Sequence, residues 1–346
     1  MATASAFGGH ERDPAWRELD LGVWDGLRRT EIEQRFPEEL AAARWGSDLS
    51  IEGGEAMPAF VERISSAFET LIGRLDDGDH AVVVTHGGAI QVLTSVVLSS
   101  QNGPPPLRGP DNTSLTSLVA DGPMRRVQVY NDATHLDRPA GRKDGTSVLL
   151  FRHGETDANI GRIWQGRGDG NLTATGQAQA EQLALTAPDL DRVLTSPARR
   201  AQDTAAGVAS RQKLETEVVA DLVEIDLGSW EGLTGSEAKE MAPDLFKRIY
   251  VDGHDEPRGV TGESFVDAGE RLGRVIDEAA ATSPNQTVGM FTHGGVTKAY
   301  VAGLLGIGFT GRDRIPMMGN AASARIEFHD DSPMLAAYNV ARYPHG

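Results

Sequence analysis

The chain has 346 residues, a formal net charge of −17 at pH 7 and no cysteine, and 39% of its residues are hydrophobic. A chain of this length is expected to form roughly two domains of about 100–200 residues each, and its composition excludes a disordered chain. The missing cysteines exclude disulfides and thiolate chemistry, the acidity argues against nucleic-acid and anionic-membrane partners, and no apolar run is long enough to span a membrane.

The first apolar pattern along the chain predicts a helix followed by a strand. Between Met57 and Leu71 the apolar residues recur at helical spacing. The short apolar run at residues 81–84 predicts a strand that is buried on both faces.

In the second half, predicted strands and helices alternate. Short apolar runs predict strands at residues 147–151, 191–195 and 287–291. Helical spacing and helix-start signals predict helices over residues 175–185, 197–209 and 265–279 and from Val296, with Ser196 as the N-cap of the second. This alternation predicts an α/β fold in which helices cover both faces of a mostly parallel sheet.

The sequence also repeats itself at an almost constant offset of 206–208 residues. The matching segments are residues 16–27 with 222–233, 54–55 with 262–263, 84–88 with 291–295, 112 with 320, and 130–131 with 338–339. Five ordered matches at one offset indicate a duplicated domain.

The two copies are unequal in length. Residues 146–209 have no counterpart in the first copy, so we expect the C-terminal two-thirds of a domain followed by a whole one. The join is polar and contains Pro139 and Gly141, as is typical of a linker. We therefore divide the chain into a partial domain at residues 1–133, a linker at 134–146 and a complete domain at 147–346.

Charged and polar residues follow the predicted strands of the second copy. Arg152 and His153 follow the first strand, Arg200 follows the second, His293 follows the third, and Glu224 lies in a repeated segment. Such residues meet at one edge of a parallel sheet. Arginine binds phosphate oxygens with two donors, a neutral histidine can attack phosphorus, and a carboxylic acid can protonate the leaving oxygen. The set predicts phosphoryl transfer.

These residues stand in motifs that resemble the histidine phosphatase (phosphoglycerate mutase-like) superfamily. The motifs are Val-Leu-Leu-Phe-Arg-His-Gly-Glu-Thr at 148–156, Thr-Ser-Pro-Ala-Arg-Arg-Ala-Gln-Asp-Thr-Ala at 195–205, Glu-Ile-Asp-Leu-Gly-Ser-Trp-Glu-Gly from 224, Gly-Glu-Ser at 262–264 and Thr-His-Gly-Gly at 292–295. The resemblance covers essentially all of residues 147–346. It implies a three-layer α/β/α fold with a mostly parallel central sheet, in tandem, with the first copy incomplete.

The resemblance also implies a role for each matched residue. His153 would be the nucleophile that becomes phosphohistidine, and Glu224 would donate the proton to the leaving group. The phosphoryl group would be held by Arg152, Arg200 and His293. The phosphate or leaving-group side would be lined by Asn159, Gln165, Gly166 and Gly294. No metal and no organic cofactor is implied, because arginine and histidine supply the positive charge.

Several residues near these motifs have simpler interpretations. Arg199 is predicted to be a solvated charge, and the Gly-rich stretch at 166–170 favours a turn over a phosphate-binding loop. Glu263 and Ser264 are explained equally well as caps of the next helix or as residues with a direct role in the site. An exposed loop pair is predicted for His254 and Asp255. Helix core is favoured over an apolar lid for Met241, Phe246, Ile249 and Tyr250.

The first copy keeps part of the site. It retains Glu18, Glu55 and His86 but lacks the nucleophile and both arginines, so we predict that it is catalytically silent. Three interpretations stay open: the recorded chain starts downstream of the true beginning, the copy is a degenerate partner domain, or another chain supplies the missing strand. An unpaired strand edge favours self-association, so the incomplete domain is a candidate homo-oligomer contact.

The main functional prediction is a metal-independent phosphatase that acts on a small phosphorylated metabolite in the cytoplasm, since no signal segment opens the chain. The alternative is a cofactor-dependent phosphoglycerate mutase. It is disfavoured because Thr-Asp-Ala-Asn at 156–159 lacks the Trp that mutases usually carry, and because the segment from Glu224 to His293 is short for a mutase. A non-catalytic phospholigand-binding or scaffold role is the third hypothesis, for residues 1–133.

Overall fold

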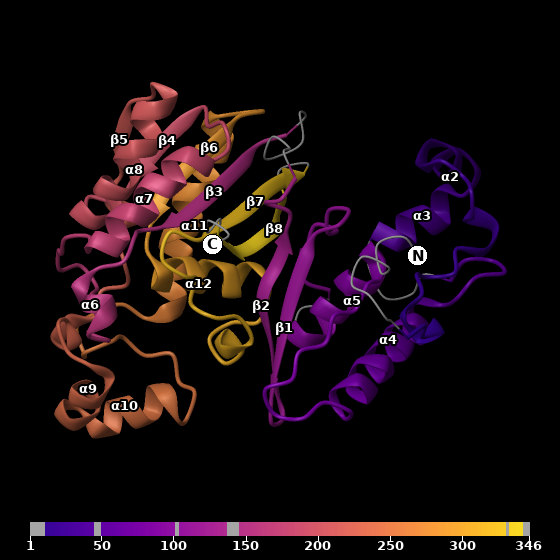
Figure 1. The fold of residues 1–346 in the computed structure, drawn as a ribbon, viewed down its shortest axis with the longest axis horizontal. Coiled ribbons are helices and arrows are strands. Elements are labelled where there is room, and N and C mark those ends of the chain that lie inside the picture. The colour runs from indigo at the N-terminus through magenta and orange to yellow at the C-terminus, as the bar shows by residue number, and fades with distance from the viewer. Residues whose placement is uncertain (1–10, 45–49, 101–103, 137–144, 330–331, 342–346) are drawn as a thin grey trace.

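The computed structural model describes residues 11–44, 50–100, 104–136, 145–329 and 332–341 (Figure 1). Within these ranges a single eight-stranded sheet runs through both copies, in the order β1-β2-β8-β7-β3-β6-β4-β5. The strands are β1 (Leu115–Asp121), β2 (Met124–Asp132), β3 (Ser147–Arg152), β4 (Arg192–Thr195), β5 (Thr216–Val218), β6 (Thr287–Thr292), β7 (Ser323–His329) and β8 (Ser332–Val340). The first copy therefore supplies two neighbouring strands at one end of the sheet.

The helices divide between the copies in the same way. The first copy contains α2 (Arg29–Arg35), α3 (Pro37–Arg44), α4 (Met57–Ile72) and α5 (Gly87–Leu98). The second contains α6 (Asp157–Ile160), α7 (Ala174–Thr186), α8 (Arg199–Gln212), α9 (Gly235–Met241), α10 (Pro243–Tyr250), α11 (Phe265–Thr282) and α12 (Gly294–Leu304). Figure 1 places α9 and α10 in a separate lobe below α6.

The central strands are apolar throughout because both of their faces are covered. On one face Leu149 and Phe151 of β3 join a core that includes Val208 of α8, and Phe151 stacks on Phe291 of β6 at 4.9 Å between ring centres. On the other face Leu150 packs in the core that α11 and α12 share. The predicted strands at 147–151, 191–195 and 287–291 are thus confirmed.

The sheet is mixed, which corrects the prediction of a mostly parallel sheet. Parallel pairing joins β3, β6, β4 and β5, whereas β1, β2, β8 and β7 pair antiparallel, and β7 also runs antiparallel to β3. Hairpins such as β7–β8 need only a short turn, and a turn leaves no helical pattern between the strands from which the pairing direction could be predicted.

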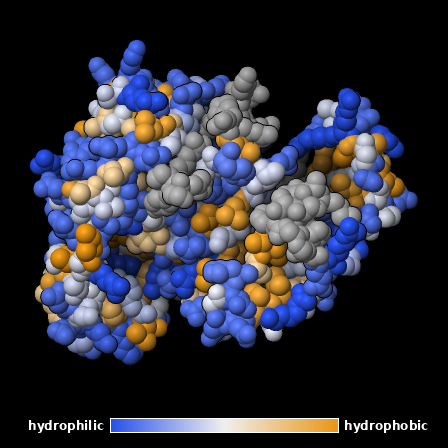
Figure 2. Space-filling view, viewed as in Figure 1, coloured by the Kyte–Doolittle hydropathy of each residue, from blue (hydrophilic) through white to orange (hydrophobic). Residues whose placement is uncertain are grey.

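The strand predicted at residues 81–84 does not form, although the structure describes these residues. Val82 is 67% exposed and Val84 is 41% exposed. Their counterparts in the second copy lie in β6, which is held between β3 and β4. The first copy has no sequence equivalent of β3 or β4, so these valines have no neighbouring strand to pair with. Figure 2 shows apolar side chains on the surface of the N-terminal half.

The two copies meet through equivalent strands. Tyr130 of β2 pairs with Tyr338 of β8, and these two buried tyrosines lie 208 residues apart in the sequence. Each hydroxyl donates to a backbone carbonyl of its own copy, Tyr130 to Arg108 and Tyr338 to Pro316 at 2.6 Å. Such a self-complementary contact is typical of two-fold dimers, and here both halves of it belong to one chain.

Candidate active site

The two predicted arginines and two predicted histidines come together at the carboxyl ends of β3, β4 and β6. Arg152 ends β3 and His153 follows it, His293 follows β6, and Arg200 lies in the first turn of α8 after β4. His153 is 4% exposed, while His293 and Arg200 are fully buried. The two imidazole rings lie edge to face with their centres 5.3 Å apart. Sequence motifs 140 residues apart thus form one polar cluster.

His153 is held in the tautomer that a nucleophile needs. Its Nδ1 lies 2.7 Å from the carbonyl oxygen of Gly154, and since a carbonyl can only accept, Nδ1 carries the proton. A neutral ring protonated at Nδ1 has its lone pair on Nε2. Burial, and then the charges of Arg152 and Arg200, lower the pKa of His153 to about 3. The ring is therefore neutral near pH 7.

His293 is a second neutral imidazole at the N-terminus of α12. Its Nε2 lies 2.8 Å from the hydroxyl of Ser196. Burial, followed by the charges of Arg200 and the neighbouring groups, holds the pKa of His293 well below its ordinary value. Ser196 was predicted as the N-cap of a helix at 197–209, but α8 begins at Arg199 with Ala198 as its N-cap. The hydroxyl of Ser196 instead contacts His293 and accepts from the backbone N–H of Ala198.

Arg152 is held by a loop that follows α12. Its Nη1 donates to the carbonyl of Met318. The loop and the start of α12 lie close to this side chain, since a Cβ on Gly294 would come within 2.7 Å of the Met317 sulfur and 3.1 Å of Arg152 Nε. Gly294 thus allows the backbone after His293 to lie against the arginine.

Arg200 is held by two carbonyls of the Gly-rich stretch. Its Nη1 donates to Gly168 at 2.7 Å and its Nη2 donates to Gly166 at 2.9 Å. Burial lowers the pKa of Arg200, yet a guanidinium stays charged in proteins. The neighbouring Arg199 is exposed and pairs with Asp203, which confirms that Arg200 is the inward-facing residue of the two.

Glu231 is a residue of this site that the sequence analysis missed. Its carboxylate accepts backbone N–H groups from Gly166 at 2.9 Å, Arg167 at 3.1 Å and Gly168 at 3.0 Å. The Gly-rich stretch is therefore more than the turn that we predicted, because it links Glu231 to Arg200. Glu231 lies more than 60 residues from the stretch that it binds. The one available signal was the motif Trp-Glu-Gly at 230–232, which is repeated as Trp-Asp-Gly at 24–26.

Glu224 is fixed by the first turn of α12. Its Oε2 accepts from Gly295 N at 2.8 Å, and its Oε1 accepts from Val296 N at 2.7 Å and Ile225 N at 2.8 Å. A Cβ on Gly295 would approach the carboxylate to 2.6 Å. The helix that His293 precedes thereby places Glu224 on the same edge of the sheet as the histidines.

A second missed residue, Arg271, supports the segment that carries Glu224. It donates to the carbonyls of Asp221, Val223 and Glu224, and it pairs with Glu263 at 2.8 Å. Burial opposes ionisation of Glu263, but the hydrogen bond and the charge of Arg271, together with the Asp226 N–H and the charge of Arg167, lower the pKa of that carboxyl. Of the two predicted caps only Ser264 caps α11, by accepting from Asp267 N.

Asn159 and Gln165 lie beside the loop that follows His153. Asn159 Oδ1 accepts from Thr156 N at 3.1 Å and from Asn320 Nδ2 at 2.9 Å, so this oxygen caps α6. Gln165 Oε1 contacts the Thr156 hydroxyl at 3.3 Å. Both side chains therefore belong to the framework around the histidines.

The lobe of α9 and α10 carries an aromatic cluster. Phe246 lies 4.7 Å from Tyr250 and 6.4 Å from the parallel ring of Trp164, and Trp230 packs against the same group. Ile249 is fully buried whereas Met241 is 57% exposed. The prediction of helix core thus holds for Ile249 and is wrong for Met241.

The predicted exposed pair His254 and Asp255 is half correct. His254 is exposed, but the Asp255 carboxylate pairs with buried Arg258 at 2.7 Å and accepts from Phe265 N and Val266 N. Because these N–H groups belong to the first turn of α11, they need acceptors outside the helix, and the Asp255 carboxylate lies where it can supply them.

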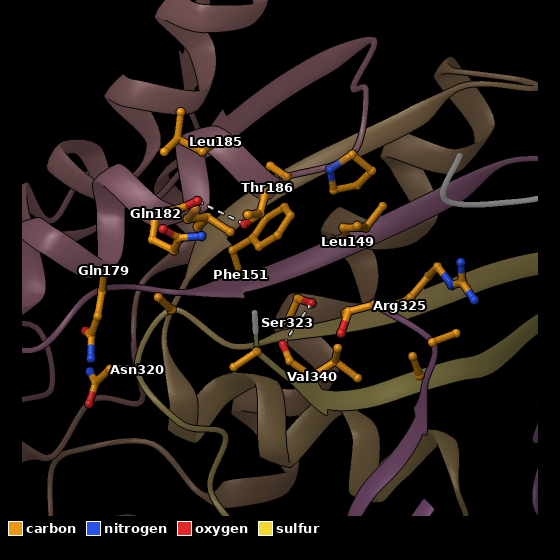
Figure 3. Close-up of a pocket in the computed structure, with 18 of the residues that line it drawn as sticks. Leu149, Phe151, Gln179, Gln182, Leu185, Thr186, Asn320, Ser323, Arg325 and Val340 are labelled. Carbon is orange, nitrogen blue, oxygen red and sulfur yellow. Dashed lines mark hydrogen bonds between the residues drawn. The ribbon is translucent and has the colours of Figure 1, made fainter. Parts of the chain in front are cut away.

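A cavity of about 720 Å³ lies on the α7 face of the sheet (Figure 3). Phe151, Gln179 and Asn320 line it, while the described part of its lining does not include His153. Figure 3 shows Gln179 and Asn320 beside each other at one end of the cavity. Asn320 also donates to the His153 carbonyl at 3.2 Å, so this residue connects the lining of the cavity to the backbone of His153.

The first copy preserves half of this arrangement. Glu18 Oε2 accepts from Gly88 N at 3.0 Å, as Glu224 does from Gly295, and Arg63 pairs with Glu55 at 2.6 Å, as Arg271 does with Glu263. The contacts around Glu224 and Glu263 are thus duplicated in the first copy, whose sequence has no equivalent of His153.

Among the described residues, neither a metal-binding cluster nor a membrane-spanning helix is found. No three His, Asp or Glu side chains among them lie close enough together to hold a metal ion. None of their helices combines the length and apolar character needed to cross a membrane.

Comparison with known proteins agrees with this geometry. The model of a family described as "Histidine phosphatase superfamily (branch 1)" matches residues 1–133 and 148–341. A protein of Mycobacterium tuberculosis named as bifunctional is 34% identical over 180 residues, which are 51% of this chain and 49% of that protein. The chain thus spans about half the length of the first curated relatives that it matches.

Two further relatives are covered more completely. A glucosyl-3-phosphoglycerate phosphatase of M. tuberculosis is 32% identical over 194 residues, 53% of this chain and 85% of that enzyme. The solved structure of a mycobacterial glucosyl-3-phosphoglycerate phosphatase with VO3 is 30% identical, with a TM-score of 0.51 over 56% of this chain and 99% of that one.

Proposed function

The chain belongs to the histidine phosphatase superfamily, branch 1, and from this membership we propose that it hydrolyses phosphomonoesters through a phosphohistidine at His153. The observation that carries the proposal is the tautomer of His153, a buried neutral imidazole with its lone pair on Nε2. We propose residues 147–346 as the catalytic domain, 134–146 as the linker and 1–133 as a partial domain that performs no chemistry.

In the first step Nε2 of His153 attacks phosphorus. An N–P bond forms as the bond from phosphorus to the ester oxygen breaks, so the phosphoryl group moves to the ring and the alcohol leaves. Burial keeps the nucleophile neutral, and the nearby charges of Arg152 and Arg200 add to this effect, because they disfavour an imidazolium beside them.

The guanidinium groups of Arg152 and Arg200 bind the equatorial phosphoryl oxygens, and His293 donates a further hydrogen bond. Fixed donors of this kind are each worth ~10²–10³ in rate, because they are in place before the charge develops. The protein itself supplies this charge, so the proposed reaction uses neither a metal nor an organic cofactor.

Glu224 donates a proton to the departing oxygen and then takes one from water. That water attacks phosphorus, the N–P bond breaks, and inorganic phosphate leaves while His153 returns to its neutral form. Both carboxylate oxygens are held by backbone N–H groups of α12 or of Ile225, which fixes the group at this edge of the sheet.

We propose a small phosphorylated metabolite as the substrate. The relatives of the chain include a glucosyl-3-phosphoglycerate phosphatase, which supports a phosphate ester of a sugar acid or a similar compound. The aromatic cluster of Trp164, Phe246 and Tyr250 is the surface on which we expect specificity to depend. We place hydrolysis ahead of a phosphoglycerate mutase reaction because residues 156–159 lack the mutase Trp.

A rapid-quench experiment with ³²P-labelled 3-phosphoglycerate and glucosyl-3-phosphoglycerate tests the proposal. We expect an acid-labile, base-stable phosphohistidine that decays to inorganic phosphate and is lost in His153→Ala. The matched control, His86→Ala in the first copy, should keep full activity. Label that appears on a second phosphoglycerate would instead support the mutase, and activity that survives His153→Ala would reject the nucleophile.

A further inference from the structure

A side chain of the second copy, that of Asn339, links the first copy to the loop that follows α12. Asn339 lies in β8 with a left-handed backbone (φ 57°). Its Nδ2 donates to the carbonyl of Gln128 in β2 at 2.9 Å, and its Oδ1 accepts from Gly319 N at 2.8 Å. One amide therefore joins the backbone of the first copy to the loop that follows α12.

The residues on either side of Gly319 hold the reacting groups. The Met318 carbonyl accepts from the Arg152 guanidinium. Asn320 donates from Nδ2 to the His153 carbonyl at 3.2 Å, and Ala321 N donates to the same oxygen at 3.2 Å. A shift of this loop would move a phosphate-binding arginine and the nucleophile together.

Other contacts of the same loop reach the junction between the two copies, where β2 pairs with β8. Arg314 Nη1 donates to the carbonyl of Leu98 at 2.9 Å, at the end of α5 in the first copy. Pro316 accepts from the hydroxyl of Tyr338, and Tyr338 pairs with Tyr130 of the first copy. The loop is thus attached to the junction at three points, residues 314, 316 and 319.

The junction also contains an internal control. Asn131, the equivalent of Asn339, has φ 55°, donates to the Ala336 carbonyl at 2.7 Å and accepts from Asp111 N at 2.8 Å. Its contacts reproduce those of Asn339 with the copies exchanged. The loop that Asn131 holds lies in the first copy, which lacks the Arg-His-Gly strand.

We propose that the first copy is a built-in positioning subunit, which orients Arg152 and His153 of the second copy through Asn339 and the loop at 314–321. Asn339 is a positioning residue in this scheme, since it touches neither the nucleophile nor its arginines. The inference rests on the proposed hydrolysis at His153 for its kinetic consequence, whereas the link between Gln128, Asn339 and Gly319 can be tested without it.

The test compares Asn339→Gly with Asn131→Gly in the full chain. Glycine tolerates the left-handed backbone at both positions, so each variant loses one amide that joins the copies and gains no strain. With p-nitrophenyl phosphate we expect kcat of Asn339→Gly to fall about tenfold with a smaller change in KM, because a displaced nucleophile slows the chemical step. Asn131→Gly should stay within twofold of the unmodified chain, although both variants should unfold at similarly lower denaturant concentrations.

Asn339→Asp separates the two halves of the link. It keeps an oxygen for Gly319 N but loses the donor to Gln128, so we expect it to lose kcat as Asn339→Gly does. Full activity in Asn339→Asp, or equal kcat in the two glycine variants, would overturn the role of the first copy.

Deuterium exchange supplies a readout independent of turnover. We expect faster exchange at residues 316–321 in Asn339→Gly and at residues 108–114 in Asn131→Gly. If the unmodified chain hydrolyses no ester, the proposed function fails, and exchange alone then decides the link. Exchange at 316–321 that is the same in both variants would overturn it.

Discussion

Glu231 and Arg200 both hold the Gly166–Gly168 stretch, Glu231 through its backbone N–H groups and Arg200 through its carbonyls. A buried cation and a carboxylate that do not touch each other are thereby joined through peptide groups. The position of the Arg200 guanidinium, which we propose binds phosphate, thus depends on a side chain outside the polar cluster.

The first prediction concerns this link. Glu231→Gln replaces one acceptor oxygen by an amide donor that faces backbone N–H groups, so the loop should shift and carry Arg200 with it. We expect kcat to fall by about tenfold, in line with the loss of one charged hydrogen-bond acceptor. Steady-state kinetics with p-nitrophenyl phosphate measure this.

Glu240→Gln is the control for Glu231→Gln, because Glu240 is exposed on α9 and carries the same charge. It should leave kcat unchanged. Equal kcat in the two variants would show that the loop holds Arg200 without help from Glu231.

The second prediction compares neighbouring arginines. Arg200→Lys should lower kcat by ~10²–10³, because a single ammonium cannot reproduce the planar contacts of a guanidinium with two carbonyls and a phosphate. Arg199→Lys, one residue away and exposed, should change kcat less than twofold. A similar loss in both variants would indicate damage to α8 and would contradict the assigned role of Arg200.

The polar cluster was predictable from the sequence because its residues follow buried strands. The apolar runs of β3 and β6 are continuous, so they specify both a strand and its burial, and the residue after each strand then lies at the carboxyl edge. Arg152, His153 and His293 follow from this pattern together with the motifs.

The supporting residues were not predictable in the same way. Glu231, Arg271 and Asn339 act on backbone groups that lie between about 20 and 210 residues away, and a backbone group leaves no mark in the sequence. The one indirect signal is duplication: Arg63 repeats Arg271, and Asn131 repeats Asn339, at the same offset of 208 residues. The prediction of a strand at 81–84 is wrong for a different reason. A local apolar run indicates a buried strand, but it cannot supply the neighbouring strand that the run must pair with.

The third prediction concerns pH. The pKa of His153 is lowered to about 3 in the folded chain, whereas an exposed imidazole has a pKa of about 6.5. The nucleophile should therefore stay neutral as the pH falls from 8 to 5. In ¹³C-labelled histidine spectra, the His153 ring signal, assigned by its absence in His153→Asn, should not move over this range. A titration midpoint near 6.5 would contradict the buried neutral state.

The same shift has a consequence for stability. Below a pH of about 6.5 the unfolded chain takes up a proton at this position and the folded chain does not, so the free energy of unfolding should decrease as the pH falls toward 3. The slope from this one group is at most about 1.4 kcal/mol per pH unit. His153→Asn removes the group and should make the acid dependence less steep, as measured by urea unfolding at a series of pH values.

The fourth prediction tests Glu224 as the proton donor. An alkyl phosphate has a poor leaving group that needs the proton, whereas p-nitrophenolate leaves readily without one. Glu224→Gln should therefore lower kcat for an alkyl phosphate by ~10²–10⁴ and affect p-nitrophenyl phosphate far less. Gly295→Ala, whose Cβ would approach the carboxylate to 2.6 Å, should shift the same preference without changing the carboxyl itself. Phosphohistidine formation from p-nitrophenyl phosphate should persist in both variants. An equal loss for the two substrates would assign Glu224 to holding the start of α12, through its contacts with Gly295 and Val296, and would remove it from the proton-transfer step.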